Sequence, residues 1–126
     1  MPNKKYNILD RLIAEKIHTI DAGYRTFRVD IKRGLKDEGQ KCFGLTDFDS
    51  CVISLDKSMD PGIAKETFFH ELTHIALELS GLGGGEDGSV VRERSNEELT
   101  TQVSRGLLLL INLNPKAFEI INEGEK

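Results

Sequence analysis

One segment constrains the fold of this 126-residue chain more than any other, the stretch over residues 61–80. Its apolar residues recur at helical spacing and fall on one side of a helical wheel: Phe68, Phe69, Leu72, Ile75, Ala76 and Leu79. Asp60 is a candidate N-cap, Pro61 suits the first helical position, and Gly81 suits the residue after the helix. We therefore predict a long helix that packs one side on a sheet and leaves its other side to line a cleft.

The residues before this helix predict one shorter helix and a small sheet. Apolar spacing predicts a first helix over residues 7–20, with Gly23 as a plausible stop. Alternating and β-branched residues predict three strands, over residues 24–32, 41–45 and 50–55. Residues 34–40 are expected to form a polar turn. This order favours a three-stranded, antiparallel-rich sheet in an α+β fold.

The residues after the long helix predict a loop and one or two helices. Glycines crowd the connection over residues 82–94, which we expect to be a flexible loop. Ser95 or Asn96 can cap a last long helix, whose apolar stripe comprises Leu99, Val103, Leu107 and Leu110. Pro115 either ends that helix or begins a short terminal one. We find no repeat and no second domain, so residues 1–126 are predicted to form a single domain.

Composition excludes several classes of protein. The formal net charge of −4 argues against a general nucleic-acid binder, which needs a basic face. The longest apolar run, residues 107–111, is far shorter than the ~18 residues that span a bilayer. Polar residues interrupt what would be a signal-peptide core near Asn7 and Asp10. Cys42 and Cys51 are expected to be free thiols, which predicts a cytoplasmic protein. Together with the net charge and the short apolar run, this predicts no membrane or nucleic-acid partner.

The polar side of the long helix carries the pattern H-E-x-x-H, formed by His70, Glu71 and His74. Residues four apart lie one turn apart on a helix, with Cβ atoms ~6 Å apart. Two imidazoles at that separation can converge on one zinc ion at Zn–N distances of ~2.0–2.1 Å. Glu71 lies near enough to reach a water beside the metal without having to ligate it. The pattern therefore predicts a zinc site opposite the apolar stripe, in preference to a solvated helix face.

A catalytic zinc site usually has a third protein ligand, and the spacing leaves its identity open. Glu97 and Glu98 stand at the start of the last helix, and the glycine-rich loop lets that helix fold back beside the first. Both carboxylates would also complement the positive end of the helix dipole. His18 is the third histidine of the chain, and we expect it to be packed or at the surface.

The sequence resembles the ImmA/IrrE-type zinc peptidases, including small phage-like members. The resemblance rests on E-T-F-F-H-E-L-T-H-I-A over residues 66–76, followed by Asn96-Glu97-Glu98 and the helix that begins there. It implies a minimal gluzincin-like zincin in which Glu97 is the third zinc ligand and Thr101 is a polar residue one turn later. It also implies a protein or peptide substrate, such as a regulatory repressor. The family tends to have Ala and Asn where this chain has Thr100 and Thr101.

These features together predict a zinc-dependent metallopeptidase, a hydrolase of peptide bonds. Zn²⁺ would lower the pKa of a water toward ~7, and Glu71 would take its proton as general base and deliver it to the leaving amine. Tyr24, Arg94 and Arg105 are candidates for stabilising the oxyanion. Two alternatives stay open: a catalytically silent zincin-like module that binds a regulatory protein, and a metal-free α+β interaction domain.

Overall fold

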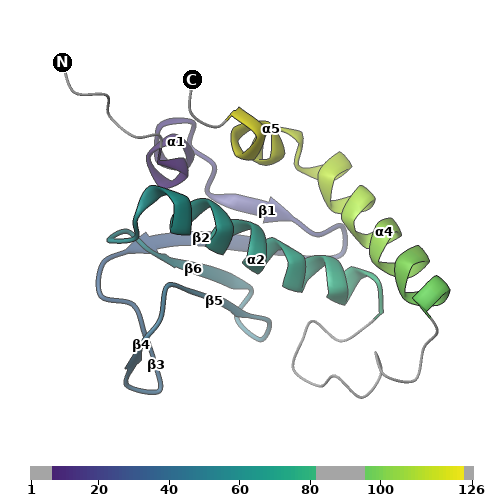
Figure 1. Cartoon of the computed structure of the whole chain (residues 1–126), viewed down its shortest axis with the longest axis horizontal. Helices are drawn as coiled ribbons and strands as arrows, with labels where there is room; N and C mark the ends of the chain where they lie inside the picture. Colours follow the sequence, from purple (N-terminus) through teal and green to yellow (C-terminus); the bar gives the residue numbers. More distant parts are fainter. Residues whose placement is uncertain (1–6, 82–95, 124–126) are drawn as a thin grey trace.

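The computed structural model describes residues 7–81 and 96–123, which form a mixed α+β fold (Figure 1). The elements are α1 (Ile8–Ala14), β1 (Thr19–Asp21), β2 (Thr26–Lys32), β3 (Lys36–Asp37), β4 (Gln40–Lys41), β5 (Gly44–Asp47), β6 (Val52–Asp56), α2 (Pro61–Leu79), α4 (Asn96–Leu113) and α5 (Pro115–Glu123). The predicted α+β class is confirmed. No helix of the described residues is long and apolar enough to cross a membrane.

The main sheet has four strands in the order β1-β2-β6-β5. β2 pairs with β1 antiparallel and with β6 parallel, and β5 pairs antiparallel with β6 at the edge. The predicted three-stranded, antiparallel-rich sheet is therefore wrong in strand number, and its central pair is parallel. A separate two-stranded hairpin, β3–β4, occupies the segment predicted as a polar turn.

The extra strand of the sheet comes from the end of the predicted first helix. That helix begins as expected, since the Asn7 side chain accepts a hydrogen bond from the Leu9 N–H at 2.9 Å, but it ends at Ala14. Lys16 then adopts a positive φ of 58°, which turns the chain out of the helix. Ile20 is buried in β1 opposite Phe27. Ile17 and Ile20 continue the helical spacing of the residues before them. Two apolar residues are too few, however, to distinguish a helix from a short strand.

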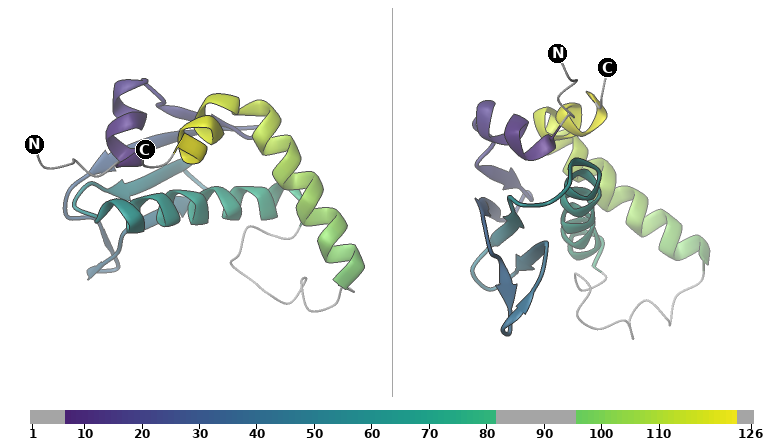
Figure 2. Two further views of the ribbon diagram at one scale, coloured as in Figure 1. Left: turned by 45° about the horizontal axis from the view of Figure 1, so that its top comes forward. Right: turned by 60° about the vertical axis from the view of Figure 1, so that its left-hand side comes forward.

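α2 closely follows the prediction. The Asp60 side chain caps it by accepting a hydrogen bond from the Gly62 N–H at 3.2 Å, and Gly81 follows its end with a φ of 80°. The buried apolar side of α2 faces the core with Phe68, Leu72, Ile75 and Ala76. Phe69 is 43% exposed, contrary to the prediction, because it lies at the margin of the apolar stripe. α2 thus lies between the sheet and α4 (Figure 2).

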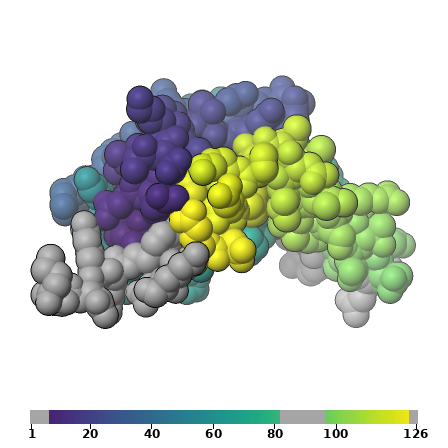
Figure 3. Space-filling view, turned by 90° about the horizontal axis from the view of Figure 1, so that it is seen from above, coloured from purple at the N-terminus to yellow at the C-terminus, as the bar shows by residue number. Residues whose placement is uncertain are grey.

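The last two helices pack against different helices, α4 against α2 and α5 against α1. Pro115 begins α5, which packs against α1 (Figure 3), where Arg11 and Glu123 form an ion pair at 2.9 Å. α4 crosses α2 near Ser80, whose hydroxyl lies 2.7 Å from the Gln102 carbonyl oxygen. Gly106 lies at this crossing, where a Cβ would collide with the Ala76 carbonyl. Ser95 and the glycine-rich loop lie outside the described residues, and Asn96 is the first residue of α4.

Candidate metal centre

The two histidines of the H-E-x-x-H pattern face each other on the polar side of α2. The Nε2 atoms of His70 and His74 are 3.2 Å apart, and their ring planes are inclined by 82°. Two nitrogens bound tetrahedrally to one zinc ion at ~2.0–2.1 Å would be about 3.3–3.4 Å apart. In the absence of metal, the same approach is a hydrogen bond between the two imidazole rings. The spacing of the two rings therefore fits a shared zinc ion.

Glu71 lies beside the histidines, but its side chain turns into the seam between α2 and the edge strand β5. The residue is only 5% exposed. Its Oε1 accepts a hydrogen bond of 2.7 Å from the Thr46 hydroxyl. A Cβ on Gly44 would lie 3.0 Å from Oε2 and 2.6 Å from the Thr67 methyl, so a glycine is needed for this close approach. β5 and α2 thus enclose the carboxylate between them.

Several carboxylates act on the thiol of Cys42. Cys42, which precedes β5, has its pKa raised by burial first and then by the carboxylates of Asp37, Glu71 and Asp56. A thiol in such a field is held in its neutral form. Cys42 is therefore an unreactive neighbour of the site rather than an activated nucleophile.

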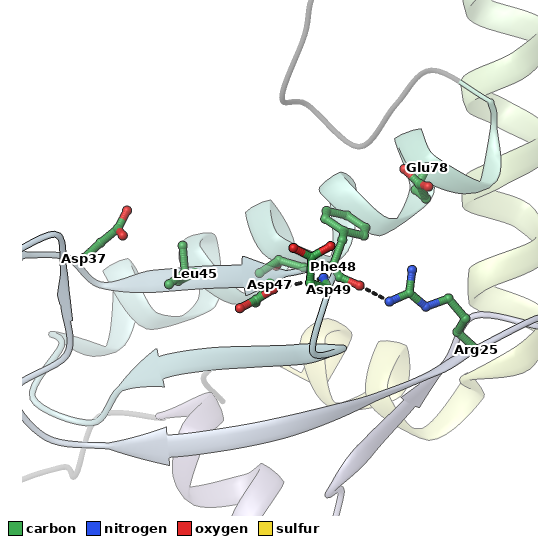
Figure 4. A pocket seen from close by; sticks show the side chains of 8 residues that line it. Arg25, Asp37, Leu45, Asp47, Phe48, Asp49 and Glu78 are labelled. Carbon is green, nitrogen blue, oxygen red and sulfur yellow. Dashed lines mark hydrogen bonds between the residues drawn. The ribbon is translucent and has the colours of Figure 1, made fainter.

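A cleft of about 470 Å³ lies along β5 and the turn that follows it (Figure 4). It is lined by Thr46 of β5, by Glu78 of α2 and by Phe48 of the turn between β5 and β6. Arg25, from the turn before β2, also lines the cleft and donates a hydrogen bond to the Phe48 carbonyl. Because Thr46 both lines the cleft and binds Glu71, the cleft adjoins the buried carboxylate.

The two candidate carboxylate ligands lie at the exposed start of α4. Glu97 and Glu98 line a shallow hollow with Thr101 and Gln102. The crossing with α2 begins at Gln102, and the start of α4 extends away from α2 (Figure 2). In residues 7–81 and 96–123 there is no group of three or more His, Cys, Asp or Glu side chains that could hold a metal. These residues thus bring His70 and His74 together without Glu97, whose role stays a prediction.

The remaining candidates that the structure describes lie on elements other than α2. His18 is exposed just before β1. Tyr24 is 58% exposed in the turn before β2, and Arg105 is exposed on α4. Arg94 lies outside the described residues. Nothing in these positions selects an oxyanion-stabilising residue.

Sequence reasoning missed three residues that shape the site. Glu78 could have been found, because it lies one further turn along the helix face that carries His70 and His74. No sequence pattern pointed to Arg25 or Thr46, because their places beside the cleft depend on how the strands pair and on which strand lies next to α2.

Comparison of this chain with models of known protein families, with curated proteins and with solved structures finds no match.

Proposed function

We propose that this chain is a zinc-dependent metallopeptidase with the layout of a minimal gluzincin-like zincin. The observation that supports this most strongly is the 3.2 Å approach of the His70 and His74 Nε2 atoms, with Glu71, the residue after His70, buried against β5. An H-E-x-x-H pattern on a solvated helix would not need its glutamate buried against a neighbouring strand.

Each residue of the motif has a distinct role in this proposal. His70 and His74 would hold the zinc ion, with Glu97 as the predicted third ligand. A bound zinc ion would supply Lewis-acid polarisation of the scissile carbonyl and would make water more acidic. Glu71 takes a proton from the attacking water and later delivers it to the leaving amine. Its burial in the seam with β5 keeps the carboxylate in one place for both transfers.

The cleft supports a peptide as the substrate. It offers about 470 Å³ of space next to Thr46, and hence next to Glu71. The resemblance to ImmA/IrrE-type peptidases favours a regulatory protein as the natural substrate and the cytoplasm as its compartment. We propose no nucleic-acid or membrane partner, in keeping with the net charge of −4.

Zinc content of the purified protein tests the metal site. The protein is stripped with a chelator, reconstituted with zinc and desalted, and its metal is measured by elemental analysis. We expect about one equivalent in the wild type and in the control His18→Ala, and less than ~0.2 equivalents in His74→Ala. A wild-type value below ~0.2 equivalents would refute the proposal.

A second measurement separates the peptidase from the catalytically silent module. The zinc-loaded protein is incubated with a complex peptide mixture, and new termini are identified by mass spectrometry. We expect cleavages that disappear with a chelator and in Glu71→Gln. Stoichiometric zinc binding without any cleavage would instead favour a module that binds a regulatory protein.

A further inference from the structure

We propose that Thr46 is a positioning residue for Glu71. Its hydroxyl holds one carboxylate oxygen of Glu71 and thereby orients the other oxygen for proton transfer. This inference deepens the proposed function, in which Glu71 is the general base, and rests on it. It assigns a role in the reaction to the edge strand β5.

The geometry of β5 supports this role. Gly44 and Thr46 are two residues apart, so they share one face of the strand, and both contact Glu71. Gly44 gives the carboxylate room, because a Cβ there would lie 3.0 Å from Oε2. Thr46 gives it a donor, with Oγ1 2.7 Å from Oε1, a normal distance for an O–H···O hydrogen bond. One residue therefore admits the carboxylate and the other orients it.

A single hydrogen bond matters here because the carboxylate has few others. Among the described residues, Thr46 supplies the hydrogen bond that the Glu71 side chain receives. No lysine or arginine of these residues forms an ion pair with it, and burial limits access of water. Loss of the hydroxyl would leave a buried charged group without its donor and free to rotate about its last torsion.

Two substitutions separate the hydroxyl from the shape of the side chain. Thr46→Val keeps the branched shape and removes the donor, whereas Thr46→Ser keeps the donor and removes a methyl group. Thr26→Val is the matched control, because Thr26 is an exposed strand threonine on β2. All three variants are compared with the wild type after unfolding measurements confirm that each is folded.

The first readout requires neither metal nor substrate. In metal-free protein labelled with carbon-13 at the glutamate carboxyl groups, the Glu71 resonance is assigned with Glu71→Gln. At fixed pH we expect Thr46→Val to shift this resonance and leave those of the other glutamates in place. Thr46→Ser and Thr26→Val should leave all of them unchanged. An unshifted Glu71 resonance in Thr46→Val would overturn the proposal.

The second readout is the rate of cleavage by zinc-loaded protein, measured with a peptide identified in the mixture described above. We expect Thr46→Val to lower kcat by about 10-fold or more and to leave KM within about twofold, since a hydrogen bond to a charged group is lost. Thr46→Ser should recover kcat to within about threefold, because the charge-assisted bond is restored. Equal losses in the valine and serine variants would overturn the proposal. A zinc-loaded wild type without activity would refute the proposed function, and the carboxyl resonance would still decide whether Thr46 holds Glu71.

Discussion

Two carboxylates are buried among residues 7–81 and 96–123, and their surroundings differ. Asp56, at the end of β6, is 0% exposed and accepts three hydrogen bonds: from the Ser58 N–H at 2.8 Å, the Ser58 hydroxyl at 2.6 Å and the Leu35 N–H at 3.1 Å. Glu71 is almost as buried, yet the described residues supply it with one hydrogen bond, from Thr46.

The number of hydrogen-bond donors distinguishes Asp56 from Glu71, for which we propose the role of general base. The hydrogen bonds from Ser58, followed by that from Leu35, lower the pKa of Asp56, so its charge is stabilised in the folded state. Asp56 thereby joins the base of the β3–β4 hairpin to the sheet. Glu71 keeps an oxygen to which the described residues donate no hydrogen bond. A carboxylate with spare accepting capacity can take up and release a proton during a reaction.

The largest effect that sharpens this comparison is expected from Glu71→Gln. The amide keeps the shape of the side chain and can still accept from Thr46, but it cannot act as a base. Hydrolysis should fall by ~10²-fold or more, with zinc content unchanged. Cleavage assays and elemental analysis of the same sample measure both quantities. If the variant lost its zinc, Glu71 would be a ligand instead of the base.

The next effect concerns the exposed carboxylates of α4. Glu97→Ala should weaken zinc binding by about 100-fold or more, because a three-ligand site loses one ligand. Glu98→Ala should keep zinc and cost only ~0.3–1 kcal/mol of stability, as expected for an acidic residue near a helix start. Competition with a chromophoric chelator measures the affinities. The reverse pattern would make Glu98 the ligand, and retention in both variants would point to His18 next.

A smaller effect is expected when the structural carboxylate is changed. Asp56→Asn replaces an acceptor oxygen by an NH₂ group that must face donors, the Leu35 N–H or those of Ser58. The free energy of unfolding should fall by about 1–3 kcal/mol. Urea denaturation at neutral pH measures it. Asp30→Asn is the control, since Asp30 makes only a partly exposed ion pair of 3.9 Å with Lys32, and it should change stability by less than about 1 kcal/mol.

The smallest effect is the pH dependence of the difference in unfolding free energy between the wild type and Asp56→Asn. The pKa of Asp56 is lower in the folded state than in the unfolded chain, so its contribution to stability is present above the unfolded value and is lost as the pH falls through the folded one. The stability gap between wild type and Asp56→Asn should be constant from neutral pH to about pH 5 and should narrow below about pH 4. Metal-free protein is used so that zinc release does not contribute. A gap that stayed constant to about pH 3 would contradict this assignment.

Local signals in the sequence were sufficient for α2 and for the motif it carries. The cap at Asp60, the proline after it and the glycine at position 81 act within a few residues, and the apolar stripe needs no partner to be recognised. The side-by-side placement of His70 and His74 follows from helix geometry alone. Local signals failed at residues 15–21, where a short apolar pattern suited two structures and Ile20 joined β1.

The sequence by itself determined which side chains of α2 share a face, because helical periodicity is a property of the chain. Only the tertiary structure decided what meets that face. β5 reaches Glu71 because β6 pairs parallel with β2 and leaves β5 at the edge of the sheet, beside α2. Such pairings join residues far apart in the chain, so no local pattern encodes them. The placement of Thr46 as donor to Glu71, and the cleft that Thr46 lines, therefore depend on how the strands pack against α2.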